Sequence, residues 1–147
     1  MRYSEAGLGR VFVLRLEDGD RLPETIEEFA RKKGILRALC LALGGAGGAS
    51  RLVVGPETEE GMPPRPVVLP LDGVHEIACV GTLFPDEEDR PILHMHAACG
   101  RGEKTVTGCV RTGVDIWKVG EVVILELTGT GARRAKDPET GFTLLDP

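Results

Sequence analysis

Short apolar runs rich in β-branched residues recur along most of the chain, and each is bounded by glycine, proline or acidic residues. Such runs are typical of strands, and the residues between them are typical of turns. The predicted strands are 11–16, 35–43, 51–55, 67–71, 75–83, 91–99, 106–111 and 122–127. Residues 115–119 stay ambiguous, and we expect the apolar end of the polar tail, 142–145, to pack back on the core.

A helical period appears clearly in one place, residues 22–33. Gly34 supplies a helix stop directly after it. The apolar residues that recur at helical spacing are Leu22, Ile26, Phe29 and Ala30. Many strands around one early helix indicate a single α+β domain with a mostly antiparallel sheet.

Length and charge narrow the classes of function. A chain of 147 residues suits one domain with a real core, and its net charge of −5 argues against general nucleic-acid binding. We interpret the two basic clusters, 31–33 and 133–136, as solvated surface. The longest apolar run, 39–43, is far too short to span a bilayer, and the first residues do not resemble a signal peptide. We therefore expect a cytoplasmic protein with no membrane partner.

The most specific chemical feature is a pair of histidines, His94 and His96, within the predicted strand 91–99. Side chains alternate faces along a strand, so both imidazoles point the same way. Leu93, Met95, Ala97 and Cys99 would then point to the opposite face. Two imidazoles about 7 Å apart along a strand can share one metal ion.

A third ligand depends on strand register. If the strands on either side of Gly102 form a hairpin, His96 lies opposite either Cys109 or Gly108. Only the first register brings Cys109 to the face of the two histidines. A set of two imidazoles and one thiolate suits zinc and leaves a fourth position open. His75 is a further candidate ligand that the sequence does not place.

Two other interpretations of these residues remain open. In the first, the histidines are hydrogen-bonded strand residues and Cys109 is a small core residue. In the second, the metal serves a hydrolase or lyase, which also needs a general base. Glu76, Glu103 and the acidic turn 86–89 are candidate bases, but none belongs to a complete catalytic motif. We therefore favour binding over catalysis and name no catalytic residue.

The order of motifs resembles the PPC family, the plant-and-prokaryote domain that plant proteins join to AT-hook segments. The resemblance covers roughly residues 8–147, which we take as the domain, with 1–7 as an N-terminal tail. It rests on the helix motif 22–29, the glycine-rich turn 44–48, and the strings HEIACVGTL (75–83), PILHMHAACG (91–100), VTGCVRTG (106–113) and EVVILEL (121–127).

The resemblance implies a central antiparallel sheet flanked by helices, assembled as a homotrimer. His94 and His96 match the family's histidine pair, and Cys109 stands where the family has a third histidine. A thiolate there keeps zinc plausible and makes the site softer. The family is often associated with DNA, but the sequence contains no Arg-Gly-Arg-Pro core of an AT-hook.

Three functions follow from these observations. The leading hypothesis is a trimeric binding or assembly module with a zinc site, whose ligands are proteins or small molecules. The alternatives are a DNA-associated regulator and a metal-dependent hydrolase or lyase.

Overall fold

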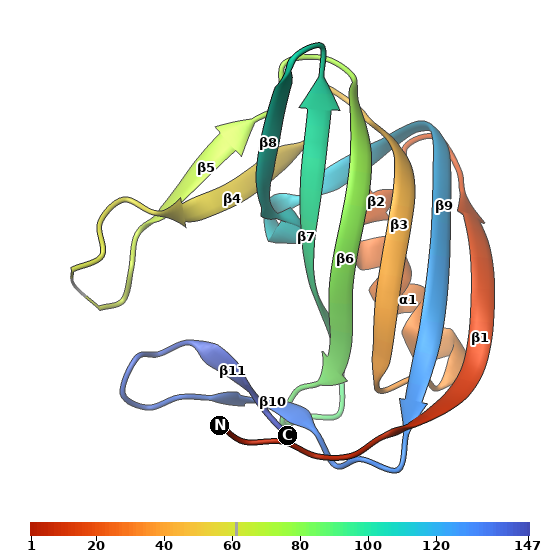
Figure 1. Ribbon diagram of the computed structural model, residues 1–147, viewed down its shortest axis with the longest axis vertical. Helices are drawn as coiled ribbons and strands as arrows, with labels where there is room; N and C mark the ends of the chain where they lie inside the picture. Colours follow the sequence, from red (N-terminus) through yellow and green to blue (C-terminus); the bar gives the residue numbers. More distant parts are fainter. Residues whose placement is uncertain (61) are drawn as a thin grey trace.

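One large antiparallel sheet dominates the computed structural model, which describes residues 1–60 and 62–147 (Figure 1). The sheet runs in the order β1-β9-β3-β6-β7-β8-β4-β5, with the short β2 beside β9, and β10 and β11 form a separate hairpin. The elements are β1 (Gly7–Leu16), β2 (Arg21–Leu22), α1 (Glu24–Lys33), β3 (Ala38–Ala46), β4 (Arg51–Pro56), β5 (Pro66–Pro70), β6 (His75–Pro85), β7 (Pro91–Arg101), β8 (Lys104–Cys109), a 3₁₀ turn (Val110–Thr112), β9 (Val114–Thr128), β10 (Arg133–Lys136) and β11 (Thr143–Asp146).

The predicted α+β class, with helices flanking the sheet, is wrong. Strands make up 57% of the chain and helix 9%, so the fold is β-rich. Within residues 1–60 and 62–147, α1 is the one α-helix, and it lies against one face of the sheet (Figure 1). The segments after β8 continue as strands that pair with existing strands, so they supply no second helical layer. Among the described residues, therefore, no helix covers the opposite face of the sheet.

The core lies between α1 and the inner face of the sheet. Helix residues Ile26 and Ala30 are fully buried there, and Gly34 ends the helix as predicted, with a left-handed φ of 65°. Cys40 and Cys79 also lie in this core, and burial raises the pKa of their thiols to about 12.

The outer face of the sheet is apolar and exposed. One row of paired residues crosses the sheet from β1 to β8. Two of its valines are strongly exposed, Val13 by 81% and Val80 by 59%. In order, the row is Val13, Val123, Leu41, Val80, His96 and Cys109. The apolar face thus runs directly into the candidate ligands at the β7–β8 end. We call this row of six residues the outer row.

The structure assigns one ambiguous segment and corrects two sequence-based expectations. The ambiguous residues 115–119 belong to β9, and Lys118 interrupts the regular pattern with a φ of 62°. The predicted strand 106–111 ends at Cys109, where the chain turns into the 3₁₀ segment. Residues 142–145 do not pack on the core, because they form an exposed hairpin strand against β10. Among the described residues, no helix has the length and apolar character needed to cross a membrane.

Gly108 permits the close approach of β4 and β8. A Cβ at Gly108 would lie 2.6 Å from the carbonyl oxygen of Val53 and 3.0 Å from the Cβ of Leu52. We expect Gly108→Ala to lower the free energy of unfolding by about 1–3 kcal/mol, since backbone must move to relieve the contact. Urea denaturation measures the loss. Gly131→Ala is the control, because a Cβ there meets no described atom within 4 Å. Equal effects of the two substitutions would contradict this account.

Candidate metal centre

The β7–β8 hairpin sets the register on which the third ligand depends. A two-residue turn joins the strands, with Gly102 at its first position and a φ of 59°. From this turn the pairing proceeds without a bulge, and His96 lies opposite Cys109. This is the first of the two registers that the sequence left open.

The strand pleat places the two histidines as predicted. Leu93, Met95, Ala97 and Cys99 are buried on the inner face, while His94 and His96 lie on the outer face. The backbone N–H of Leu93 donates a hydrogen bond of 2.9 Å to a carboxylate oxygen of Glu27, which ties this part of β7 to α1. The two imidazoles thus project from a strand that is anchored to α1.

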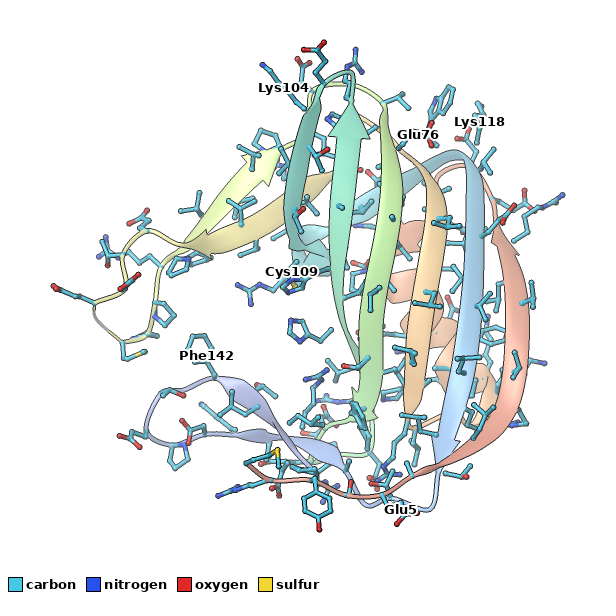
Figure 2. All side chains as sticks on the ribbon, in the orientation of Figure 1. Glu5, Glu76, Lys104, Cys109, Lys118 and Phe142 are labelled. Carbon is cyan, nitrogen blue, oxygen red and sulfur yellow. The ribbon has the colours of Figure 1, made fainter. Side chains whose placement is uncertain are left out.

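The structure brings the three predicted ligands together. The Nε2 atoms of His94 and His96 are 3.2 Å apart, and the ligand atoms of His94, His96 and Cys109 all lie within 4.8 Å of one another. Cys109 is 6% exposed, whereas both histidines are exposed. Figure 2 shows Cys109 at the end of β8, at the edge of the long strands. We call these three residues the His-His-Cys cluster.

The spacing of the two imidazole nitrogens fits an ion with tetrahedral coordination. Zinc–nitrogen bonds of about 2.0–2.1 Å place two imidazole nitrogens about 3.3 Å apart in a tetrahedral site. The observed separation of 3.2 Å between the Nε2 atoms agrees with that value. The same separation also suits a hydrogen bond from one neutral imidazole to the other, so the nitrogen spacing alone does not choose between the two interpretations.

The surroundings of His94 favour its neutral imidazole. Partial burial of the His94 ring lowers its pKa, and the positive charge of Arg134, the neighbouring His96 and the positive charge of Arg111 lower it further. A neutral imidazole is the form that binds a metal ion. The cluster therefore holds His94 ready as a ligand at neutral pH.

Arg134 differs from its sequence-based interpretation as solvated surface. It is 6% exposed, and its Nη2 donates hydrogen bonds to the carbonyl and hydroxyl oxygens of Thr82, the cross-strand partner of His94. Burial lowers the pKa of Arg134, and the nearby Cys109 acts in the opposite direction. Sequence reasoning missed Arg134 and Arg111 as neighbours of the cluster, because the hairpin that carries Arg134 reaches the sheet only through the tertiary fold.

The other residues considered for the site lie elsewhere. His75 is buried, and its Nδ1 lies 3.0 Å from the carbonyl oxygen of Gly73, so it does not join the cluster as a fourth ligand. Glu76 pairs with Gly100. Gly100 lies four residues along β7 from His96, which corresponds to about 13 Å. Glu103 lies in the hairpin turn beyond Gly100.

The acidic turn 86–89 makes contacts outside the cluster. The carboxylate of Asp86 accepts a hydrogen bond of 2.8 Å from Arg90. Within residues 1–60 and 62–147, the cluster contains no carboxylate. The candidate bases therefore do not support the hydrolase or lyase alternative.

Three solved structures of similar fold each cover at least 96% of the chain. A metal-containing protein from Archaeoglobus fulgidus is 27% identical, with a TM-score of 0.85 and coverage of 100% of both chains. A plant- and prokaryote-conserved protein from Pyrococcus horikoshii has the same TM-score at 24% identity and covers 100% of this chain and 98% of its own. A protein from Bacteroides thetaiotaomicron, described as a presumed DNA-binding protein, has a TM-score of 0.76 at 17% identity and 96% coverage of both chains. At their lower identities, the last two show the fold alone.

A sequence relative is the bifunctional protein GlmU of Synechococcus sp. (strain JA-3-3Ab), 28% identical over 134 residues. The match covers 90% of this chain and 20% of that protein, so this chain spans about a fifth of its relative's length.

The family profile of the Plants and Prokaryotes Conserved domain matches residues 3–128, which is most of the chain. This match confirms the resemblance drawn from the order of motifs. The chain belongs to the Plants and Prokaryotes Conserved domain family.

Proposed function

We propose that this protein is a homotrimeric assembly module that holds a zinc ion between His94, His96 and Cys109. The observation that carries the proposal is the pairing of His96 with Cys109, which brings one thiol and two imidazoles within 4.8 Å. The similar protein from Archaeoglobus fulgidus, described as metal-containing, gives independent support.

The donor set favours zinc over harder cations. Two imidazole nitrogens and a thiolate suit zinc, whereas magnesium and calcium prefer oxygen ligands. Three protein ligands leave one coordination position for water or another ligand. The exposure of both histidines leaves that position accessible from the outer face.

The outer row supports assembly. Monomeric proteins rarely expose a large continuous apolar patch, and such a patch marks an interaction site. Val13, Leu43 and Val80 are all more than half exposed on this face. A second and third copy of the chain would cover the aliphatic part of the row, from Val13 to Val80, in keeping with the trimer that the family resemblance implies.

Elemental analysis and light scattering test the two parts of this proposal separately. Protein purified without chelator should contain about one zinc ion per chain. Its scattering mass at micromolar concentration should be three times the mass of one chain. Less than about a tenth of an equivalent of transition metal would contradict the zinc site. A monomer mass would contradict the trimer.

Direct DNA binding is a weaker alternative, which rests on the description of a distant structure. The net charge of −5 disfavours contacts with the phosphates of DNA. We expect no shift of duplex DNA in a retardation assay at about 150 mM salt with tens of micromolar protein. A shift that weakens steeply with added salt would establish DNA binding and contradict this expectation.

A further inference from the structure

Two arginines beside the His-His-Cys cluster have no acidic partner. Within residues 1–60 and 62–147, neither Arg111 nor Arg134 forms an ion pair with a carboxylate. The buried Nε of Arg134 also has no hydrogen-bond partner among these residues. A buried charge without a counter-ion is costly, so an anion at this point would stabilise the arrangement.

A cavity adjoins the cluster on the side of Arg111. Its volume is about 310 Å³, and it lies between the β4–β5 arm and the segment that leads into β11. Val53, which pairs with Cys109, and Arg111 connect it to the cluster. Its remaining wall is largely apolar and includes Pro56, Pro66 and Phe142. Figure 2 shows Phe142 projecting from the hairpin toward the β4–β5 arm.

The charges around the open coordination position favour an anion. With zinc bound, one thiolate offsets only part of the positive charge of the ion and the two arginines. Arg134 donates a hydrogen bond to Thr82, the cross-strand partner of His94, and Arg111 follows Cys109 by two residues. An oxyanion on the ion would complete the coordination and pair with both guanidinium groups at once.

We infer that the open coordination position binds the carboxylate of a small molecule whose apolar body occupies the adjoining cavity. This inference rests on the zinc site proposed above. Arg111 and Arg134 hold the carboxylate, and Val53 and Phe142 contact the body. One ligand can carry both the carboxylate and the apolar body, because the charged and apolar walls are contiguous at Arg111 and Val53.

Substitution with cobalt allows metal binding and carboxylate binding to be followed separately by absorption spectroscopy. Cobalt(II) loaded into the protein reports metal binding through its thiolate absorption, and its visible bands report a change of the fourth ligand. Benzoate, added in a buffer without chloride or phosphate, should shift the visible bands with saturation. Acetate, which has no apolar body, and benzyl alcohol, which has no charge, should each bind at least about tenfold more weakly.

Variants assign the contacts. Arg111→Gln and Arg134→Met should each weaken benzoate binding by about tenfold to a hundredfold while cobalt still binds. Arg134→Lys keeps the charge and should recover part of the loss, which separates charge from packing. Arg31→Gln, on α1 behind the sheet, is the control and should leave benzoate affinity unchanged.

The outcomes separate the two proposals. If cobalt fails to bind, both the proposed zinc site and the inferred carboxylate site are contradicted. If cobalt binds but benzoate leaves the bands unchanged, only the carboxylate site is overturned. Equal binding of benzoate and acetate, or no effect of either site arginine, would also overturn it.

Discussion

Replacing His94 or His96 by alanine should lower the affinity for zinc by more than about a hundredfold. Removal of a partner of a metal ligand already costs about tenfold to a hundredfold, and loss of a ligand itself costs more. Both histidines are exposed, so their replacement should leave the fold intact. Competition with a zinc-binding dye measures the affinity, and circular dichroism checks the fold.

Matched controls separate the cluster from the rest of the chain. His75→Gln removes the histidine that the structure places outside the cluster, and it should leave zinc affinity unchanged. Cys109→Ala should behave like the histidine variants, whereas Cys79→Ala, in the core, should alter stability but not zinc affinity. Equal losses of zinc in Cys109→Ala and Cys79→Ala would contradict the assignment of Cys109.

Leu41→Asp should convert the trimer to a folded monomer. Leu41 lies in the middle of the outer row and is 39% exposed in the single chain. A carboxylate buried there by assembly would have no partner in the row, and such burial costs several kcal/mol. Light scattering measures the mass, and circular dichroism shows whether the monomer keeps its strands.

Leu145→Asp is the control for this substitution. It places the same charge at a leucine of similar exposure, 45%, on the separate β10–β11 hairpin. The control should remain a trimer. If both variants remain trimers, the outer row is not the interface.

The geometry of the histidine pair could be predicted because it depends on local rules. Strand alternation alone places His94 and His96 on one face, and the structure agrees. The contribution of Cys109 could not be settled in the same way, since a slip of one residue would turn it to the other face. A two-residue turn at Gly102 decides the register.

Features that depend on distant segments were beyond the sequence. Arg134 comes from the part of the tail that the charge pattern indicated as solvated, yet it is buried against Thr82. Residues 142–145 are apolar but pair with β10 instead of packing on the core, because an edge strand offers them backbone hydrogen bonds. The expectation of helices flanking the sheet failed for the same reason, since the later segments pair as strands.

A crystal structure of protein grown with zinc, with anomalous data collected on both sides of the zinc edge, tests the central claim most directly. We predict one strong peak at about 2.0–2.1 Å from the Nε2 atoms of His94 and His96 and about 2.3 Å from the Sγ of Cys109. If no anomalous peak lies at the cluster, and the two imidazoles bond only to each other, the claim of a zinc site is contradicted.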